Sequence, residues 1–274
     1  MGGQAPPASP YGFMIGQCVP AVKRTLIISM GTDSGIAAEA ASVMMSQRGA
    51  LPFRKKRVSP LRLRRRKNLD SRLAAVSEWF LREKTPGRNL ALCAPEAVGI
   101  AAELGCGMGG FIEAKARIQP QVFHLAFERD ANALVRAAER AATAELHNVR
   151  FILDDAQALR QYVADGELSL LYINFCNPWP ARRHLTRRLT HPRFLEDYAA
   201  LLRPNGVMAF KTDNRDLFAY SLDALRRENW HLLNVTEDLH GTGPRPTDDV
   251  ITEYERKFMA LGIRIFRLEA RPPS

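Results

Sequence analysis

Several features that would place a chain in a special class are missing from this sequence. Its four cysteines (Cys18, Cys93, Cys106 and Cys176) lie far apart without a Cys-x-x-Cys pair, and its six histidines are scattered. Zinc sites and disulfide frameworks need closely spaced ligands or paired cysteines, so we expect reduced, independent thiols and no metal. No stretch reaches the roughly 18 uninterrupted apolar residues of a membrane span. The N-terminus lacks the pattern of a secretory signal, which predicts a cytoplasmic protein without a membrane partner.

Positive charge is what the sequence has in excess. Its 274 residues carry 39 Lys and Arg against 29 Asp and Glu, a net charge of +10. Residues 1–58 hold seven of the basic and two of the acidic residues, so about a fifth of the chain carries half of this charge. Gly, Pro, Ser and Ala dominate there, and we interpret 1–58 as a disordered extension or as upstream sequence that is not translated. The excess favours an anionic partner such as nucleic acid.

Residues 59–97 form a basic arm and a leading helix in our interpretation. A basic run at 62–67 is either a solvated arm or an arm that binds nucleic acid. Asp70 and Ser71 then open an amphipathic helix that Pro86 and Gly87 end. The apolar residues of this predicted helix are Leu73, Val76, Trp79, Phe80 and Leu81.

From residue 98 to the end, short apolar runs alternate with helical patterns. Helices are predicted at 131–143, 193–202 and 215–228. Strands are predicted at 98–104, 122–127, 149–153, 168–175, 207–211, 230–235 and 263–268. This alternation predicts an α/β fold with a doubly wound, mostly parallel seven-stranded sheet.

A glycine-rich loop follows the first predicted strand. Gly105, Gly107 and Gly110 fit the G-x-G-x-x-G turn of dinucleotide-binding proteins, whereas Gly105, Gly107 and Gly109 fit the G-x-G-x-G turn of enzymes that bind S-adenosylmethionine. In both classes the glycines let the backbone approach a ligand at a helix N-terminus. The loop alone leaves the two open.

Acidic residues end the next two predicted strands. Glu128 is placed to accept both hydroxyls of a ribose, which NAD and S-adenosylmethionine share. The pair Asp154 and Asp155 follows the third strand, where an acid can bind an adenine amino group or simply cap a helix.

The fourth predicted strand leads into Asn-Pro-Trp-Pro at 177–180 and then into a basic cluster at 182–188. Ligands bind beyond the carboxyl ends of strands in open α/β sheets, so this segment faces the cleft. A polar residue before Pro and an aromatic ring suits a loop that holds a nucleic-acid base. Arginine side chains bind phosphate well, so we expect the whole basic cluster 182–188, Arg182 and Arg183 included, to contact a nucleic-acid backbone.

Two polar clusters lie towards the C-terminus. Asp213 belongs to Lys-Thr-Asp-Asn at the end of the fifth predicted strand, and Thr252 opens Thr-Glu-Tyr-Glu. Side chains at strand ends on one rim would complete a pocket. The pattern of Thr252 and Glu255 also fits a plain capping box at a helix start, and the residues alone do not separate these two interpretations.

Together these segments resemble the bacterial tRNA (guanine-N7)-methyltransferases, from about residue 60 to the end. The motifs that carry the resemblance are Glu-Leu-Gly-Cys-Gly at 103–107, Phe-Glu-Arg at 127–129, Asp-Asp-Ala at 154–156, Asn-Pro-Trp-Pro-Ala-Arg-Arg-His at 177–184, Lys-Thr-Asp-Asn at 211–214 and Thr-Glu-Tyr-Glu at 252–255. The resemblance implies a Rossmann-like class I methyltransferase fold that uses S-adenosylmethionine to methylate N7 of a guanine in tRNA, at position 46 of the variable loop.

The resemblance also implies roles for single residues. Donor binding falls to Glu103, Gly105, Gly107, Glu128, Asp155 and Asn177. Asn177 is also the catalytic-loop residue. Substrate binding falls to Arg182 and Arg183, which supply positive charge, and to a second group that contacts the guanine or shapes its pocket. This second group is Asp213, Thr252, Glu253, Tyr254 and Glu255. The chain departs from the family at Met108 and Ala181, where lysine is common, and at Asn177, where Asp is common.

The departure at Asn177 does not by itself predict an inactive protein. Guanine N7 has a free lone pair and no proton, so methyl transfer needs alignment and no general base. Two other interpretations stay open: a catalytically silent tRNA-binding relative, and a class I methyltransferase with a different substrate. The sequence does not decide between a monomer and a homodimer.

Overall fold

The computed structural model describes residues 68–87, 94, 96–241 and 249–273, all of which belong to the unit Pro60–Ser274. The predicted extension over 1–58 and the basic run 62–67 lie outside the described residues, as do Cys18 and Cys93. Cys106 and Cys176 are free thiols. None of the described helices is long and apolar enough to cross a membrane.

The described residues form a seven-stranded sheet in the order β3-β2-β1-β4-β5-β7-β6. Strands β1 to β5 are parallel, and β7 pairs antiparallel with β5 and β6. The strands are β1 (Gly99–Leu104), β2 (Val122–Phe127), β3 (Val149–Ile152), β4 (Leu168–Asn174), β5 (Leu202–Thr212), β6 (His231–Leu232) and β7 (Phe266–Arg271). This sheet confirms the predicted doubly wound α/β class.

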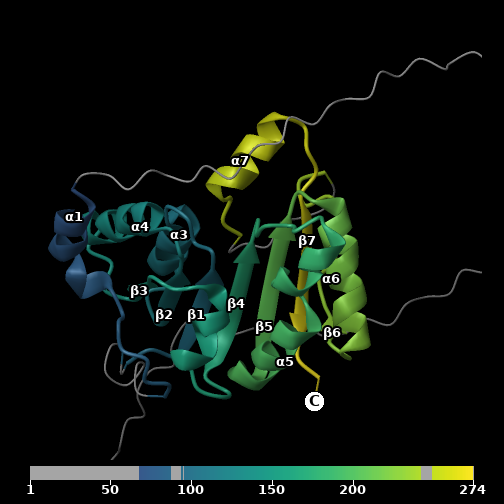
Figure 1. Ribbon diagram of the computed structural model, residues 1–274, viewed down its shortest axis with the longest axis horizontal. Coiled ribbons are helices and arrows are strands. Elements are labelled where there is room, and N and C mark those ends of the chain that lie inside the picture. The colour runs from purple at the N-terminus through teal and green to yellow at the C-terminus, as the bar shows by residue number, and fades with distance from the viewer. Residues whose placement is uncertain (1–67, 88–93, 95, 242–248, 274) are drawn as a thin grey trace, which may run out of the picture. The chain divides into compact units, whose positions relative to one another are not determined.

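Helices cover both faces of the sheet (Figure 1). One face carries α1 (Leu69–Ala75), α3 (Gly110–Ile118) and α4 (Ala131–Thr143). The other face carries the 3-10 helix η2 (Ala156–Gln161), α5 (Pro192–Leu201) and α6 (Arg215–Arg227). Residues that alternate along β2 contribute to both layers. Phe123, Leu125 and Phe127 belong to the core cluster that includes α5 and α6, whereas Ala126 belongs to the cluster that includes α3 and α4.

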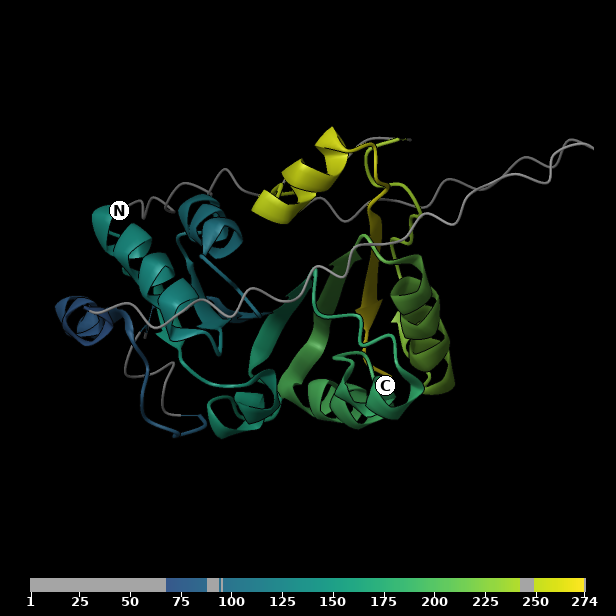
Figure 2. The same cartoon turned by 45° about the horizontal axis from the view of Figure 1, so that its top comes forward.

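The strand order reverses between β1 and β4, so the loops that follow these two strands lead to opposite faces of the sheet. The crevice between two such loops is where ligands of these sheets bind. Helix α7 (Glu253–Ala260) lies above the carboxyl ends of β4 and β5 in both views (Figures 1 and 2). The candidate residues therefore collect along one edge of the sheet.

The leading helix is shorter than the pattern predicts. Helix α1 ends at Ala75, and a 3-10 turn η1 (Ser77–Trp79) follows it. The Trp79 indole donates to the carbonyl of Leu146 at 3.0 Å, and Phe80 forms a parallel bridge to Phe151 at the edge of β3. The chain turns extended at Phe80 because it covers this sheet edge, a tertiary contact that the helical pattern does not record.

Three strands also differ from their predicted bounds. Strand β5 begins at Leu202, five residues before its predicted start at 207, because Leu202 already pairs with Leu168 of β4 ahead of a register shift. Regular pairing of β6 stops at Leu232, and only single contacts such as Leu233 N to Glu269 O continue beyond it. The last strand begins at Phe266 instead of residue 263 because the chain is still closing helix α7 there. Gly262 adopts a φ of +67°, and the amide of Ile263 donates back to Phe258.

Candidate active site

The loop between β1 and α3 is shaped by glycines with positive φ. The φ angles are +82° at Gly105, +55° at Gly107 and +80° at Gly109, values at which any other residue is strained. A β-carbon added to Gly105 or Gly107 would meet no atom within 4 Å. The loop therefore borders open space, and its bare backbone is available to a ligand.

Glu103 lies beneath this loop as a buried acid with an unsatisfied atom. Its side chain is 2% exposed, and its Oε1 accepts a hydrogen bond from Asn174 Nδ2 at 3.0 Å. Its Oε2 has no partner among the described residues. Burial raises the pKa of Glu103 to about 7, an effect that the Asn174 bond opposes and the charge of Glu128 reinforces. A cation delivered by a ligand would satisfy the free oxygen.

Glu128 binds the glycine-rich loop directly. Its Oε2 accepts from the amide of Gly107 at 3.1 Å, and its Oε1 accepts from the amide of Asp130 at 2.9 Å. The structure thus brings together the predicted residues Glu103, Gly107 and Glu128 around one loop. Each oxygen of Glu128 keeps a lone pair for a further donor.

The two acids after β3 have different partners. Asp154 forms an ion pair with Lys84 at 2.8 Å and accepts from the Tyr162 hydroxyl at 3.3 Å. The Lys84 contact lowers the pKa of Asp154. Asp155 caps η2 by accepting from the amide of Gln157 at 3.1 Å. Asp155 is therefore the less engaged carboxylate of the pair.

The loop after β4 holds Asn177 in a defined pose. The exposed Asn177 side chain accepts from the amide of Trp179 through Oδ1 at 3.1 Å, which turns its Nδ2 away from that amide. Phe175 and Trp179 adopt φ angles of +50° and +42°, which are strained for bulky residues. The loop is a tight turn at the carboxyl end of β4, with an amide donor at its tip.

The basic cluster after this loop divides into exposed and buried members. Arg182 and Arg183 are exposed on the 3-10 helix η3 (Arg182–Arg187). Arg187 lies over the Trp179 ring at 5.0 Å. Arg188 is only 7% exposed and turns inward, which differs from our expectation that the whole cluster 182–188 contacts phosphates.

The Thr-Glu-Tyr-Glu motif begins helix α7 and reaches the loop after β4. Thr252 and Glu255 form the capping box that the pattern allowed. Tyr254 is exposed, and its ring stacks on Phe175 of the loop at 6.3 Å. Glu253 pairs with Arg140 of α4 at 2.9 Å. The capping interpretation is therefore confirmed, and the same motif contacts both the loop after β4 and α4.

Glu255 has a second role because it is also the centre of a buried charge cluster. The side chain is fully buried and lies 3.1 Å from Lys211 Nζ and 2.8 Å from His240 Nε2. Lys211 also pairs with Asp249 at 2.6 Å. With its oxygens so occupied, Glu255 has a structural role. Asp213, two residues after Lys211, is half-buried, and burial raises its pKa.

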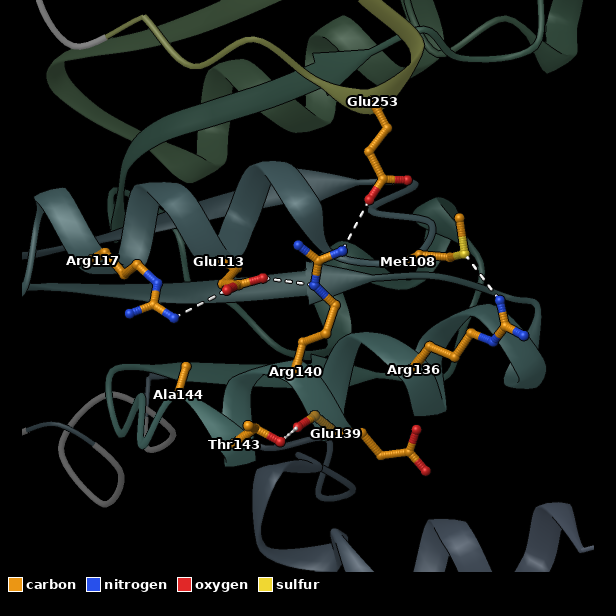
Figure 3. A pocket seen from close by; sticks show the side chains of 9 residues that line it. All are labelled: Met108, Glu113, Arg117, Arg136, Glu139, Arg140, Thr143, Ala144 and Glu253. Atoms are coloured by element: carbon orange, nitrogen blue, oxygen red, sulfur yellow. Dashed lines mark hydrogen bonds and ion pairs between the residues drawn. The ribbon is translucent and has the colours of Figure 1, made fainter. Parts of the chain in front are cut away.

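A groove of about 520 Å³ runs beside the glycine-rich loop, between α3 and α4. Figure 3 shows Met108 at one end, with Arg136 Nη1 reaching its sulfur at 3.5 Å, and an ion-pair chain through Arg117, Glu113 and Arg140 to Glu253. The pairing neutralises much of the charge along the groove. No three His, Cys, Asp or Glu side chains in the described ranges lie close enough together to hold a metal ion.

The roles of some residues that shape the site were not predicted. Asn174, Phe175 and His240 bond to or stack on residues at least 15 positions away, and Arg188, expected as a phosphate contact, binds the loop after β4 instead. A polar residue such as Asn174 at the end of an otherwise apolar strand was the one available signal.

The fold and the loop after β1 define the class of protein, a Rossmann-like class I methyltransferase. Among solved structures, the chain is similar to the 16S rRNA methyltransferase KamB, with a TM-score of 0.53 and 15% identity over 68% of this chain and 94% of that chain. It is also similar to the antibiotic-resistance methyltransferase Kmr, with a TM-score of 0.50 and 19% identity over 68% and 92%. At these identities the likeness shows the fold alone.

Sequence comparisons are more specific. The family described as "Putative methyltransferase" matches residues 98–268. A tRNA (guanine-N(7)-)-methyltransferase of Clostridioides difficile strain 630 is 39% identical over 215 residues, 77% of this chain and 99% of that protein. One of Lactococcus lactis is 44% identical over 172 residues, 63% of this chain and 79% of that protein. The chain belongs to the bacterial tRNA (guanine-N7)-methyltransferase family.

Proposed function

We propose that this protein transfers a methyl group from S-adenosylmethionine to N7 of guanine 46 in the variable loop of tRNA. Family membership and the names of the relatives support the reaction and the substrate class. The observation that carries the donor is the buried, unpartnered Oε2 of Glu103 beneath a glycine cradle that leaves space for a ligand.

The residues present fit this donor. Glu103 Oε2 would accept from the donor's ammonium group, which compensates the cost of a buried carboxylate. The open backbone at Gly105 and Gly107 would face the donor, Glu128 would accept from its ribose, and Asp155 from its adenine. Bound S-adenosylmethionine supplies the methyl group on a positively charged sulfur.

Asn177 would align the guanine, and we call the loop after β4 that carries it, residues 175–180, the catalytic loop. Its Oδ1 is held by the amide of Trp179, so Nδ2 is presented outward as a donor to guanine O6. The N7 lone pair then forms the new N–C bond while the carbon–sulfur bond breaks and its electron pair stays on sulfur. No proton is transferred, so positioning supplies the catalysis, and a carboxylate at position 177 is not required.

The exposed arginines Arg182 and Arg183 would bind the tRNA backbone beside this loop. Asp213 and Tyr254 would line the guanine pocket, with Thr252, Glu253 and Glu255 holding α7 in place. Arginine contacts to phosphate make binding fall steeply as salt rises. Two features support this placement: the arginines follow the catalytic loop directly, and the Tyr254 ring stacks on Phe175 of that loop.

The decisive experiment incubates the purified protein with unmodified tRNA and methyl-labelled S-adenosylmethionine, followed by digestion and mass spectrometry of the nucleosides. We expect N7-methylguanosine with wild-type tRNA and none when guanine 46 is replaced by adenine. Methylation that survives this replacement would overturn the assigned position. Binding of tRNA without any methylated nucleoside would instead identify a silent RNA-binding relative, and loss of both would indicate another methyltransferase substrate.

A further inference from the structure

Arg188 is a buried cation whose compensation comes from neutral groups. It is 7% exposed, and among the described residues its side-chain donors bond to carbonyl oxygens and to no carboxylate. Its Nε donates to the carbonyl of Pro178 at 3.0 Å, and its Nη2 donates to the carbonyl of Trp179 at 3.4 Å. Its guanidinium lies 4.4 Å from the ring centre of Tyr220 on α6. Burying a charge without an ion pair is costly, so these contacts call for a functional explanation.

The side chain of Arg188 contacts the catalytic loop at Pro178 and Trp179 and helix α6 at Tyr220. The peptide units around Trp179 are held from two sides, because the Trp179 amide donates to Asn177 Oδ1 and its carbonyl accepts from Arg188. The φ of +42° at Trp179 is strained for an L-residue and persists only when such contacts impose it. Tyr220 ties the guanidinium to α6 of the scaffold.

The neighbouring arginines are placed differently. Arg182 and Arg183 are exposed, and the guanidinium of the exposed Arg187 lies over the ring of Trp179. One basic cluster in the sequence is therefore divided in space between exposed cations and one inward cation that braces the loop.

We infer that Arg188 is a positioning residue for methyl transfer, which fixes Asn177 through the carbonyls of Pro178 and Trp179 and binds no phosphate. This inference rests on the proposed function. It predicts that loss of Arg188 lowers the rate of transfer and leaves tRNA affinity and its salt dependence almost unchanged. A phosphate contact predicts the reverse, with the slope of log affinity against log salt reduced by about one.

The test compares Arg188→Met with Arg182→Met and with Arg226→Met, which removes the same charge from an exposed position in the last turn of α6. Each variant is measured for kcat, KM for tRNA, tRNA affinity between low and moderate salt, donor affinity and thermal unfolding. For R188M we expect kcat to fall at least tenfold while tRNA affinity stays within about threefold. For R182M the change should fall on KM and on the salt slope. R226M should match the wild type.

A double-mutant cycle with Asn177→Ala separates positioning from a general structural role. If Arg188 acts through Asn177, removing Arg188 from the N177A protein should lower kcat by less than threefold, far less than in the wild type. Equal losses of kcat in both backgrounds would overturn the inference, and so would wild-type kcat or a reduced salt slope in R188M.

If R188M does not fold, Arg188→Lys and Tyr220→Leu replace it. R188K keeps the charge and loses the fork that reaches both carbonyls, and Y220L removes the stacking surface. A loss of kcat at constant tRNA affinity in either supports the inference, and wild-type kcat in both overturns it. Failure of the wild-type protein to methylate tRNA would instead refute the proposed function itself.

Discussion

Lys211 Nζ and Glu255 Oε2 lie 3.1 Å apart, and both side chains are buried at the junction of β5 and α7. The pair joins the strand end that carries Asp213 to the helix that carries Tyr254. Asp249 and His240 close the cluster. Since the Tyr254 ring of α7 stacks on Phe175 in the loop after β4, this cluster also fixes the helix that contacts the loop.

We expect Glu255→Gln to lower the free energy of unfolding by about 2–3 kcal/mol. The amide keeps the shape and the helix cap but leaves the buried Lys211 with one anionic partner fewer. Glu253→Gln is the matched control, because Glu253 is an exposed partner of Arg140, and exposed pairs contribute 1 kcal/mol or less. Denaturant unfolding of both variants measures the difference, and equal losses would contradict a structural role for the cluster.

Gly107→Ala should weaken donor binding at least tenfold. Alanine at a φ of +55° is strained by about 1 kcal/mol, and the new β-carbon would enter the open space above the loop. Gly262→Ala is the control, since Gly262 has a φ of +67° and equally open surroundings at the end of α7. Both variants should lose similar stability, and calorimetry with S-adenosylmethionine should separate them. Equal donor affinity in the two would place the donor elsewhere.

The contribution of Glu103 to the stability of the free protein should fall as pH rises from about 4.5 to 7. Burial raises the folded-state pKa of Glu103 to about 7, so the folded state binds a proton that the unfolded state has released in this window. The Glu103 contribution to the unfolding free energy therefore decreases with rising pH, by about 3 kcal/mol at roughly 1.4 kcal/mol per pKa unit. Buried His124, whose pKa is lowered to about 4, contributes in the opposite direction over the same range. Comparing unfolding curves of the wild type and Glu103→Gln isolates this contribution, because glutamine does not titrate.

Donor affinity should change in the opposite direction over the same range. The ammonium of S-adenosylmethionine favours the ionised form of Glu103, so binding strengthens as pH rises through about 7. The pH dependence should be lost in Glu103→Gln, whereas Glu128 stays present in both proteins. A pH-independent affinity in the wild type would show that the orphaned oxygen of Glu103 does not contact the donor.

Much of the fold could be predicted because the apolar pattern records it. The first four strands and helices α4 and α6 lie within about two residues of their predicted bounds. Their buried faces produce a local pattern of apolar residues that can be recognised in the sequence. The early end of α1 and the short β6 could not be predicted in this way. Trp79 and Phe80 respond to Leu146 and Phe151, residues about seventy positions away.

The candidate site shows the same limit. Glycines and strand-end acids such as Glu103 and Glu128 can be predicted as site residues from their residue type and their position after a strand, and the structure brings them to one loop. The role of Arg188 cannot be predicted in this way, because Arg187 lies beside it in the same basic run. Only the fold decides that one guanidinium points to solvent and the next to the carbonyls of Pro178 and Trp179.

Asn177→Ala should lower kcat about a hundredfold with little effect on donor affinity, and Asn177→Asp should stay within tenfold of the wild type. Alanine removes both the acceptor for the Trp179 amide and the outward donor. Aspartate keeps the turn, so the loop holds its shape while the contact to the base changes character. Single-turnover methylation of tRNA measures the transfer step. If N177A transferred methyl groups at the wild-type rate, alignment of guanine would have to come from other residues, with Asp213 the next candidate at the end of β5.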